Sequence, residues 1–333
     1  MLNIIVILIA FILSYFAQKY NNRKILFCVF IWLSLCCGLR NEFIGNDTSN
    51  YITFFYDIKY FGVFYGSDIG FSILSYILMY MFNNPYILLL IYSLITNYFI
   101  IYRLWDFRNK ASFSLMILIY SIIYYPYCFN IVRQFLAIAL IFWATKYLEQ
   151  KNYKKFMLIN FIAVTFHTTA IIGLISLLIE EDFVKIINKY KKHFIIFLLI
   201  FSFLILIFFS SNIYKYLSYF LLINFNLHSM IIFKLFCVLM ICFINYYQDK
   251  KIEPFYKNCI VQLRNNKIML YYFIGLILSL SGMFYDYMNR IGFYFLMFEM
   301  PFWGIVIKHH KYKKIYIMLI VFILFFYVMT TFV

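Results

Sequence analysis

Long apolar runs alternate with short polar segments along almost the whole chain. An α-helix rises 1.5 Å per residue, so about 20 apolar residues cross the ~30 Å hydrocarbon core of a bilayer. The pattern therefore predicts an all-α, polytopic integral membrane protein with roughly eleven to thirteen transmembrane helices. The expected spans are residues 2–18, 25–39, 85–102, 112–126, 130–148, 156–166, 168–179, 194–209, 229–247, 268–284, 291–307 and 315–332.

Two segments depart from simple crossing helices. If the apolar residues 69–82 also crossed the membrane, Arg40 and the basic cluster at Arg103 would lie on the same side, so 69–82 predict an interfacial or re-entrant helix. A single span over 156–179 would place the lysines that follow it on the wrong side, which predicts a broken helix at residues 166–169. The polar residues 40–68 are expected to form an external loop.

The chain has a formal net charge of +16, but its basic residues do not lie together in one patch. Basic residues gather in short clusters between the apolar runs, at 19–24, 103–110, 146–155, 185–192, 250–267 and 308–314. This positive-inside pattern places the clusters in the cytoplasm and both termini outside. Only 13% of residues are charged, against about 25% in soluble domains, so we expect one multi-span domain over residues 1–333. The partner is a lipid bilayer, and no nucleic-acid partner is expected.

Four costly polar side chains are expected at one depth in this bundle. With a rise of 1.5 Å per residue, each lies ~18–27 Å along its helix from a basic cluster. The separations are 16 residues from Lys24 to Arg40, 13 from Arg133 to Lys146, 12 from Lys155 to His167 and 18 from Arg290 to Lys308. Ionisable residues within spans indicate function by default. We expect a shared cavity open to the outside, formed by loop 40–68 and the outer span ends at 130–134, 166–170 and 286–290.

Five short motifs occur in a fixed order around these residues. They are Gly38-Leu39-Arg40 with Gly45, Asp47 and Tyr51; Asp68-Ile69-Gly70-Phe71; Asn130-Ile131-Val132-Arg133-Gln134; Phe166-His167-Thr168-Thr169-Ala170; and Asn289-Arg290. The ordered set resembles the EpsG family, the Wzy-type polysaccharide polymerases, in which Glu often stands in place of Asp68. Each motif alone is common, but together they cover most of the chain.

The resemblance implies a GT-C-like membrane glycosyltransferase. Such an enzyme joins oligosaccharide repeat units, carried on undecaprenyl diphosphate, at the outer face of the bacterial cytoplasmic membrane. Its partners would be these lipid-linked oligosaccharides and, as a candidate, a Wzz-type chain-length regulator. The residues fit this chemistry, because arginine binds phosphate through two parallel hydrogen bonds and stays charged. Arg40, Arg133 and Arg290 are therefore predicted to bind the diphosphate.

Substrate binding is predicted to extend to two neighbours of these arginines, Gln134 and Tyr51. The acceptor hydroxyl needs a general base, and two candidates stay open. His167 is one, since an imidazole takes up and releases a proton near neutral pH. Asp47 is the other, as base or as a group that orients the acceptor. No metal-binding motif occurs, so we predict a metal-independent transfer without a cofactor.

Each candidate also has a plainer structural interpretation. Arg40 at a span end can anchor in the headgroup region, His167 can be a packed and hydrogen-bonded side chain, and Asp47 can cap a turn or helix. Glu299, about mid-span, can pair with Lys234 or with the site. Other functions also stay open: a flippase or exporter of lipid-linked oligosaccharide, an O-antigen ligase-type transferase, and a membrane O-acyltransferase. A flippase would favour charges spread through the membrane and inverted-repeat halves.

Overall fold

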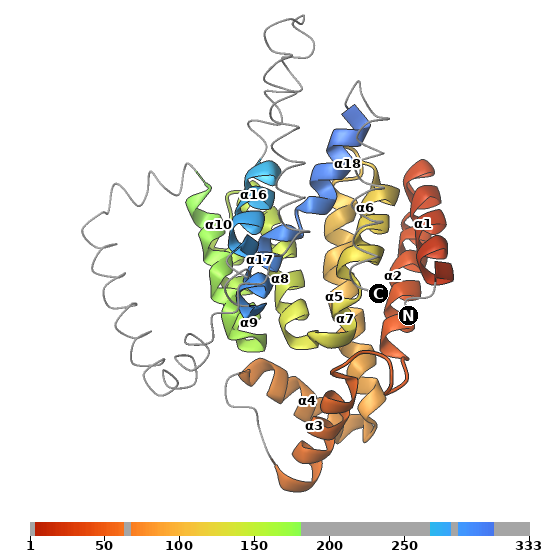
Figure 1. Cartoon of the computed structure of the whole chain (residues 1–333), viewed down its shortest axis with the longest axis vertical. Helices are drawn as coiled ribbons and strands as arrows, with labels where there is room; N and C mark the ends of the chain where they lie inside the picture. The colour runs from red at the N-terminus through yellow and green to blue at the C-terminus, as the bar shows by residue number, and fades with distance from the viewer. Residues whose placement is uncertain (1–3, 63–67, 181–266, 281–285, 310–333) are drawn as a thin grey trace, which may run out of the picture.

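The structure, a computed structural model, describes residues 4–62, 68–180, 267–280 and 286–309 (Figure 1). Every regular element in these residues is a helix, which confirms the all-α prediction for this part of the chain. The predicted spans at 194–209, 229–247 and 315–332 lie outside the described residues, as does Lys234.

The first five described helices lie between residues 4 and 106. They are α1 (Ile4–Lys19), α2 (Arg23–Gly38), α3 (Thr48–Phe61), α4 (Ile69–Phe82) and α5 (Pro85–Asp106). Asparagines at the helix starts explain several of these boundaries. Asn22 accepts from the Lys24 N–H at 2.8 Å, and Asn84 accepts from the Tyr86 N–H at 2.9 Å, so each satisfies an otherwise free helix donor. Pro85 then stands in the first turn of α5, where its missing N–H costs nothing.

The remaining elements are shorter and more often interrupted. They are α6 (Phe113–Ile119), the π-helix η1 (Tyr120–Tyr124), α7 (Tyr127–Asn130), α8 (Val132–Glu149), α9 (Tyr153–Phe166), the 3₁₀ helix η2 (Thr168–Leu174), α10 (Ile175–Leu178), α16 (Lys267–Leu280), α17 (Asp286–Leu296) and α18 (Glu299–His309). The predicted break at residues 166–169 is confirmed, because α9 ends at Phe166 and His167 adopts an extended backbone.

The segment predicted as a loop at 40–68 contains the helix α3. Its buried residues Tyr51, Phe54, Phe55 and Ile58 follow helical spacing, a signal hidden among polar neighbours. The adjacent segment 69–82 is helical over the predicted residues. In Figure 1, α3 and α4 lie together at the lower end of the bundle formed by the other helices. Residues 48–61 of the expected loop are therefore helical and pack against α4.

The predicted span 291–307 is also broken, into α17 and α18, which bend by 43°. Pro301 explains the break, because a proline lacks an N–H and its ring clashes with the carbonyl four residues earlier, here Met297. The Tyr124 hydroxyl donates to the Leu296 carbonyl at 2.8 Å, at the end of α17. It also lies 2.5 Å from a carboxyl oxygen of the fully buried Glu299.

By length and composition, one described helix can cross a membrane, namely α5, and the bent pair α17–α18 counts as a second if taken as one span. Several other apolar helices, such as α1 and α4, are shorter than that criterion requires. The number of crossings therefore stays a prediction.

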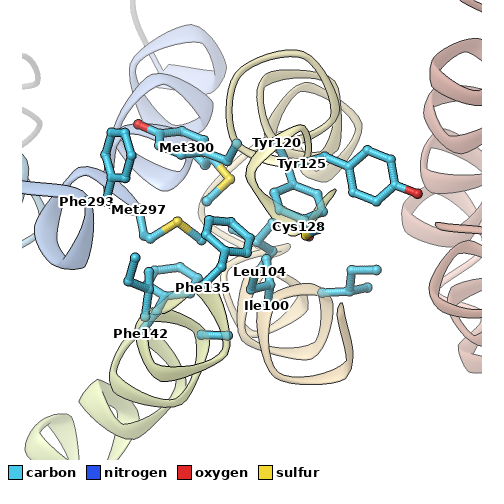
Figure 2. Close-up of a cluster of buried hydrophobic side chains, with 14 of the residues drawn as sticks. Ile100, Leu104, Tyr120, Tyr125, Cys128, Phe135, Phe142, Phe293, Met297 and Met300 are labelled. Carbon is cyan, nitrogen blue, oxygen red and sulfur yellow. The ribbon is translucent and has the colours of Figure 1, made fainter. Parts of the chain in front are cut away.

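The core lies around α8, whose residues are buried on nearly every side. Its alanines Ala137, Ala139 and Ala144 are fully buried and allow neighbouring helices to approach closely. Figure 2 shows the packed side chains at the centre. They come from α5 (Ile100, Leu104), from η1 and the turn after it (Tyr120, Tyr125), from α7 (Cys128), from α8 (Phe135, Phe142) and from α17, α18 and the junction between them (Phe293, Met297, Met300). This packing fixes the first turn of α8, which carries Arg133.

Candidate functional site

Asp68 lies between the arginine and the histidine that the sequence singled out. The Arg133 guanidinium donates to Asp68 Oδ2 at 2.6 Å. The other carboxyl oxygen, Oδ1, lies 3.6 Å from His167 Nδ1. One carboxylate thus joins residues that are 65 and 99 positions away in the sequence (133 − 68 and 167 − 68). Arg133 and His167 are brought together as predicted.

Each of the three residues stands at the end of a helix. Asp68 immediately precedes α4, Arg133 is the second residue of α8, and His167 immediately follows α9. Helix ends are where the chain changes direction, so side chains of separate helices can converge there without interrupting a hydrogen-bonded ladder. The site is therefore built from rigid helices, although its residues stand at their ends.

The closeness of α4 and α9 depends on Gly70. A β-carbon added at this position would lie 2.3 Å from Thr165 Oγ1 and 2.9 Å from Thr165 Cβ. Such contacts are far inside van der Waals distance, so only glycine permits this approach. Because Gly70 is two residues after Asp68 and Thr165 two residues before His167, the contact sets the distance between Asp68 and His167.

The three side chains differ in their access to solvent. The Asp68 side chain is 4% exposed, whereas that of Arg133 is 31% exposed and that of His167 is 26% exposed. The Arg133 guanidinium also lies over the Phe71 ring, 5.4 Å from its centroid, which adds a cation–π contact. A carboxylate buried to this degree needs a charged or hydrogen-bonding partner, and Arg133 supplies one. Asp68 is thus buried, whereas Arg133 and His167 are partly exposed to solvent.

Gln134 and Arg290 connect α8 to α17. Gln134 is buried and its side-chain amide donates to the Arg290 carbonyl at 3.2 Å. Nearby, the Tyr294 and Thr169 hydroxyls lie 3.0 Å apart and link α17 to η2. The Arg290 side chain itself is exposed. Gln134 therefore holds the backbone of α17 at Arg290, and the Arg290 side chain is exposed.

Arg40 has a different setting from Arg133, because it is only 4% exposed and lies among protein acceptors. Its guanidinium donates to Thr48 Oγ1 at 2.8 Å, to the Cys37 carbonyl at 3.1 Å and to the Phe129 carbonyl at 3.1 Å. These three bonds tie together α2, α3 and α7. The guanidinium of Arg40 is thus bound by protein acceptors, and its contact with substrate stays a prediction.

The segment before α3 is folded onto Asn130. The Asn46 N–H donates to Asn130 Oδ1 at 2.7 Å, and the Tyr51 hydroxyl donates to the Asn130 carbonyl at 3.1 Å. Gly45 has φ of 88°, and a β-carbon there would lie 2.8 Å from the Phe129 carbonyl oxygen, so glycine is required on both counts. This explains why the motif around Arg40 and the motif around Arg133 occur together.

Tyr51 connects this segment to the site. Burial raises the pKa of the Tyr51 hydroxyl, and the positive charge of the nearby Arg133 partly offsets this effect. Asp47 stands directly before α3 but makes no side-chain bond to the helix N–H groups; its carboxylate lies 3.4 Å from the Asn50 amide. Asp68, rather than Asp47, is the carboxylate that contacts both Arg133 and His167.

The order of these motifs agrees with a comparison against known protein families, in which residues 23–333 match the EpsG family. The chain belongs to the EpsG family. This is the family of Wzy-type polysaccharide polymerases, so the resemblance is confirmed. No curated protein matches the chain, and no solved structure does. EpsG membership associates the chain with membranes and with polysaccharide biosynthesis.

In this EpsG-family chain, Asp68 is the site residue that sequence reasoning quoted but did not assign. The sequence did contain a signal for Asp68. This acid stands directly before an apolar helix, and Gly70 in the first turn of that helix marks a position of close packing. Among the described residues, no three His, Cys, Asp or Glu side chains gather in a way that could hold a metal ion. Metal-independent transfer stays a prediction.

Proposed function

We propose that the chain is a membrane glycosyltransferase that polymerises a surface polysaccharide from oligosaccharide units carried on undecaprenyl diphosphate. The reaction would take place at the outer face of the bacterial cytoplasmic membrane. EpsG membership supports the class of enzyme. The observation that supports the proposal is the convergence of Arg133 and His167 on Asp68, because a guanidinium can bind phosphate and an imidazole can act as a base.

In the proposed reaction, the growing chain on one lipid diphosphate is the donor and a single lipid-linked unit is the acceptor. The acceptor hydroxyl oxygen forms a bond to the anomeric carbon of the donor. The bond from that carbon to the phosphate oxygen breaks, and the lipid diphosphate leaves with the electron pair. The hydroxyl proton passes to His167. Each cycle lengthens the polymer by one repeat unit and releases one lipid diphosphate.

Arg133 and Arg290 would stabilise the departing diphosphate. Arg133 is partly exposed at the first turn of α8, and the backbone carbonyl of the exposed Arg290 accepts a hydrogen bond from Gln134, the next residue along α8. Two guanidinium groups match two phosphates, because each planar fork can donate two parallel hydrogen bonds to phosphate oxygens. Stabilising charge as it develops on the leaving group is the largest contribution an enzyme makes in this kind of transfer.

Between the two candidate bases, the contacts favour His167. A carboxylate facing Nδ1 holds a hydrogen on that nitrogen and leaves Nε2 with the lone pair that accepts a proton. Asp68 is the carboxylate nearest to this position in the described part of the chain, with Oδ1 3.6 Å from His167 Nδ1, so a small movement would let it take this role. Asp47 instead lies against Asn50. Arg40 and Tyr51 would act by holding the segment before α3 in place, since their bonds run to protein carbonyls.

The proposal is tested by the size distribution of surface polysaccharide in a strain that lacks the protein. Accumulation of single repeat units on the outer face supports a polymerase. Accumulation of lipid-linked units on the inner face would overturn it in favour of a flippase. Full-length polymer that stays on its lipid carrier would instead indicate ligase-type transfer. Restoration by the native chain, but not by His167→Ala, assigns the defect to this site.

A further inference from the structure

The Asp68 carboxylate has two oxygen atoms and two neighbouring donors, Arg133 and His167, but it accepts a hydrogen bond only from Arg133. Oδ2 accepts from Arg133 at 2.6 Å, whereas Oδ1 is 3.6 Å from His167 Nδ1, beyond hydrogen-bond distance. His167 Nδ1 is buried and has no hydrogen-bond partner in the described part of the chain. A buried polar atom without a partner is costly and calls for an explanation.

We infer that Asp68 is a positioning residue for which Arg133 and His167 compete, and that a phosphate group binding to Arg133 transfers Asp68 to His167. This inference rests on the proposed function and adds a link between substrate binding and the base. An approach of about 0.6 Å by Oδ1 would bring it within hydrogen-bond distance of Nδ1. A rotation of the carboxylate is enough for such a movement, so no helix has to shift.

Arg133 and Asp68 differ in exposure, and this difference determines which of the two side chains an incoming anion can reach. The Arg133 side chain is 31% exposed and the Asp68 side chain only 4%, so an incoming phosphate can reach Arg133 more readily than Asp68. A diphosphate carries more negative charge than one carboxylate and offers paired oxygens to the guanidinium fork. It would therefore replace Asp68 as the main partner of Arg133.

The freed carboxylate would then hold His167 in a productive state. With Asp68 accepting from Nδ1–H, the Nε2 atom carries the lone pair, and the charge of Asp68 stabilises the imidazolium that forms when the acceptor proton is taken. His167 would thus become an effective base only after the donor diphosphate is bound. A static Asp68–Arg133 ion pair, by contrast, would only hold α4 against α8.

The two possibilities predict opposite effects of Asp68→Asn on binding. We would measure the affinity of the full chain in lipid nanodiscs for undecaprenyl diphosphate. Without the competing carboxylate, Asp68→Asn should bind this probe roughly fivefold more tightly. Arg133→Ala should bind it at least about tenfold more weakly, and adding Asp68→Asn to Arg133→Ala should then give no tightening.

Turnover should change in the other direction. At saturating donor, Asp68→Asn should lower the polymerisation rate roughly ten- to hundredfold, because His167 loses the group that orients it. Asp68→Glu keeps a carboxylate and should restore part of this rate. Asp57→Asn is the matched control, since it removes one negative charge from the neighbouring α3; it should leave both affinity and rate unchanged.

Unchanged or weaker binding by Asp68→Asn, or full turnover by this variant, would overturn the inference while leaving the proposed function intact. Failure of the native chain to bind undecaprenyl diphosphate would overturn the proposed function and this inference with it. If Asp68→Asn does not accumulate, Asp68→Ser removes the same charge, and its affinity is interpreted in the same way.

Discussion

Gly70 of α4 and Thr165 of α9 lie so close that a β-carbon on Gly70 would be 2.3 Å from the threonine hydroxyl oxygen. This contact determines how near Asp68 comes to His167, although neither Gly70 nor Thr165 has a role in the proposed reaction. The catalytic geometry proposed here therefore depends on the packing of two helices. Changes at this contact should affect activity through distance alone.

Gly70→Ala should force α4 away from α9. We expect a loss of about 1–3 kcal/mol in the free energy of unfolding, as for other overpacked contacts, and a larger relative loss of polymer than of protein. Thermal unfolding of the purified chain and polymer yield in cells measure the two effects. Thr165→Ala removes the nearest clashing atom, so it should restore part of the activity of Gly70→Ala. Ile69→Ala is the control, because the Ile69 side chain is exposed, and it should change neither stability nor polymer yield appreciably. Full activity of Gly70→Ala would contradict the proposed dependence on this contact.

Arg133→Ala and His167→Ala should each abolish polymer without reducing the amount of protein in the membrane. Arg133→Lys should also be poor, because lysine cannot reproduce the planar fork that binds paired oxygens. Polysaccharide size and immunodetection of membrane protein give the two measurements. Near-normal polymer from Arg133→Ala would rule out Arg133 as a diphosphate ligand.

Arg40 and Arg290 should behave differently when each is replaced by alanine. Arg40→Ala leaves the Phe129 and Cys37 carbonyls without their donor, so we expect a loss of about 3 kcal/mol in stability and less protein in the membrane. Arg290→Ala removes an exposed side chain, so stability should change little while polymer is lost. Thermal unfolding separates the two variants. A stable but inactive Arg40→Ala would instead support direct contact with substrate.

Glu299 should matter for stability rather than for the reaction. Its two carboxyl oxygens meet the Tyr124 and Tyr272 hydroxyls at 2.5 and 3.2 Å, beside the break between α17 and α18. Glu299→Leu removes the acceptor that these two hydroxyls share and should cost about 1–3 kcal/mol, whereas Glu299→Gln keeps an acceptor and should cost less. The melting temperature of the solubilised chain checks the order. Loss of polymer by a fully stable Glu299→Gln would show a functional role.

The predicted orientation places the start of α3 outside the cell. Ser49 is exposed and one residue into α3, so Ser49→Cys should react with a membrane-impermeant thiol reagent in intact cells. The chain has cysteines of its own, including the exposed Cys28, and the unsubstituted chain therefore gives the background. Labelling of Ser49→Cys only after the cells are permeabilised would reverse the assigned topology.

The sequence by itself determined most of the helices and one of the breaks. The apolar runs predicted α1, α2, α5, α8 and α16 to within a few residues, because burial of a helix in an apolar environment depends on local composition. The break at His167 followed from the placement of positive charges. The helix α3 was missed because only one of its faces is apolar, and the bend before Pro301 was missed although proline signals it locally.

Only the tertiary structure decided which polar residues act together. In sequence, Arg40 and Arg133 look alike, each a cation at the end of an apolar run; packing encloses the first among carbonyls and leaves the second open beside Asp68. Asp68 and His167 are 99 residues apart (167 − 68), and no local pattern encodes their distance. That distance results from how closely α4 and α9 pack, which is a property of the folded chain.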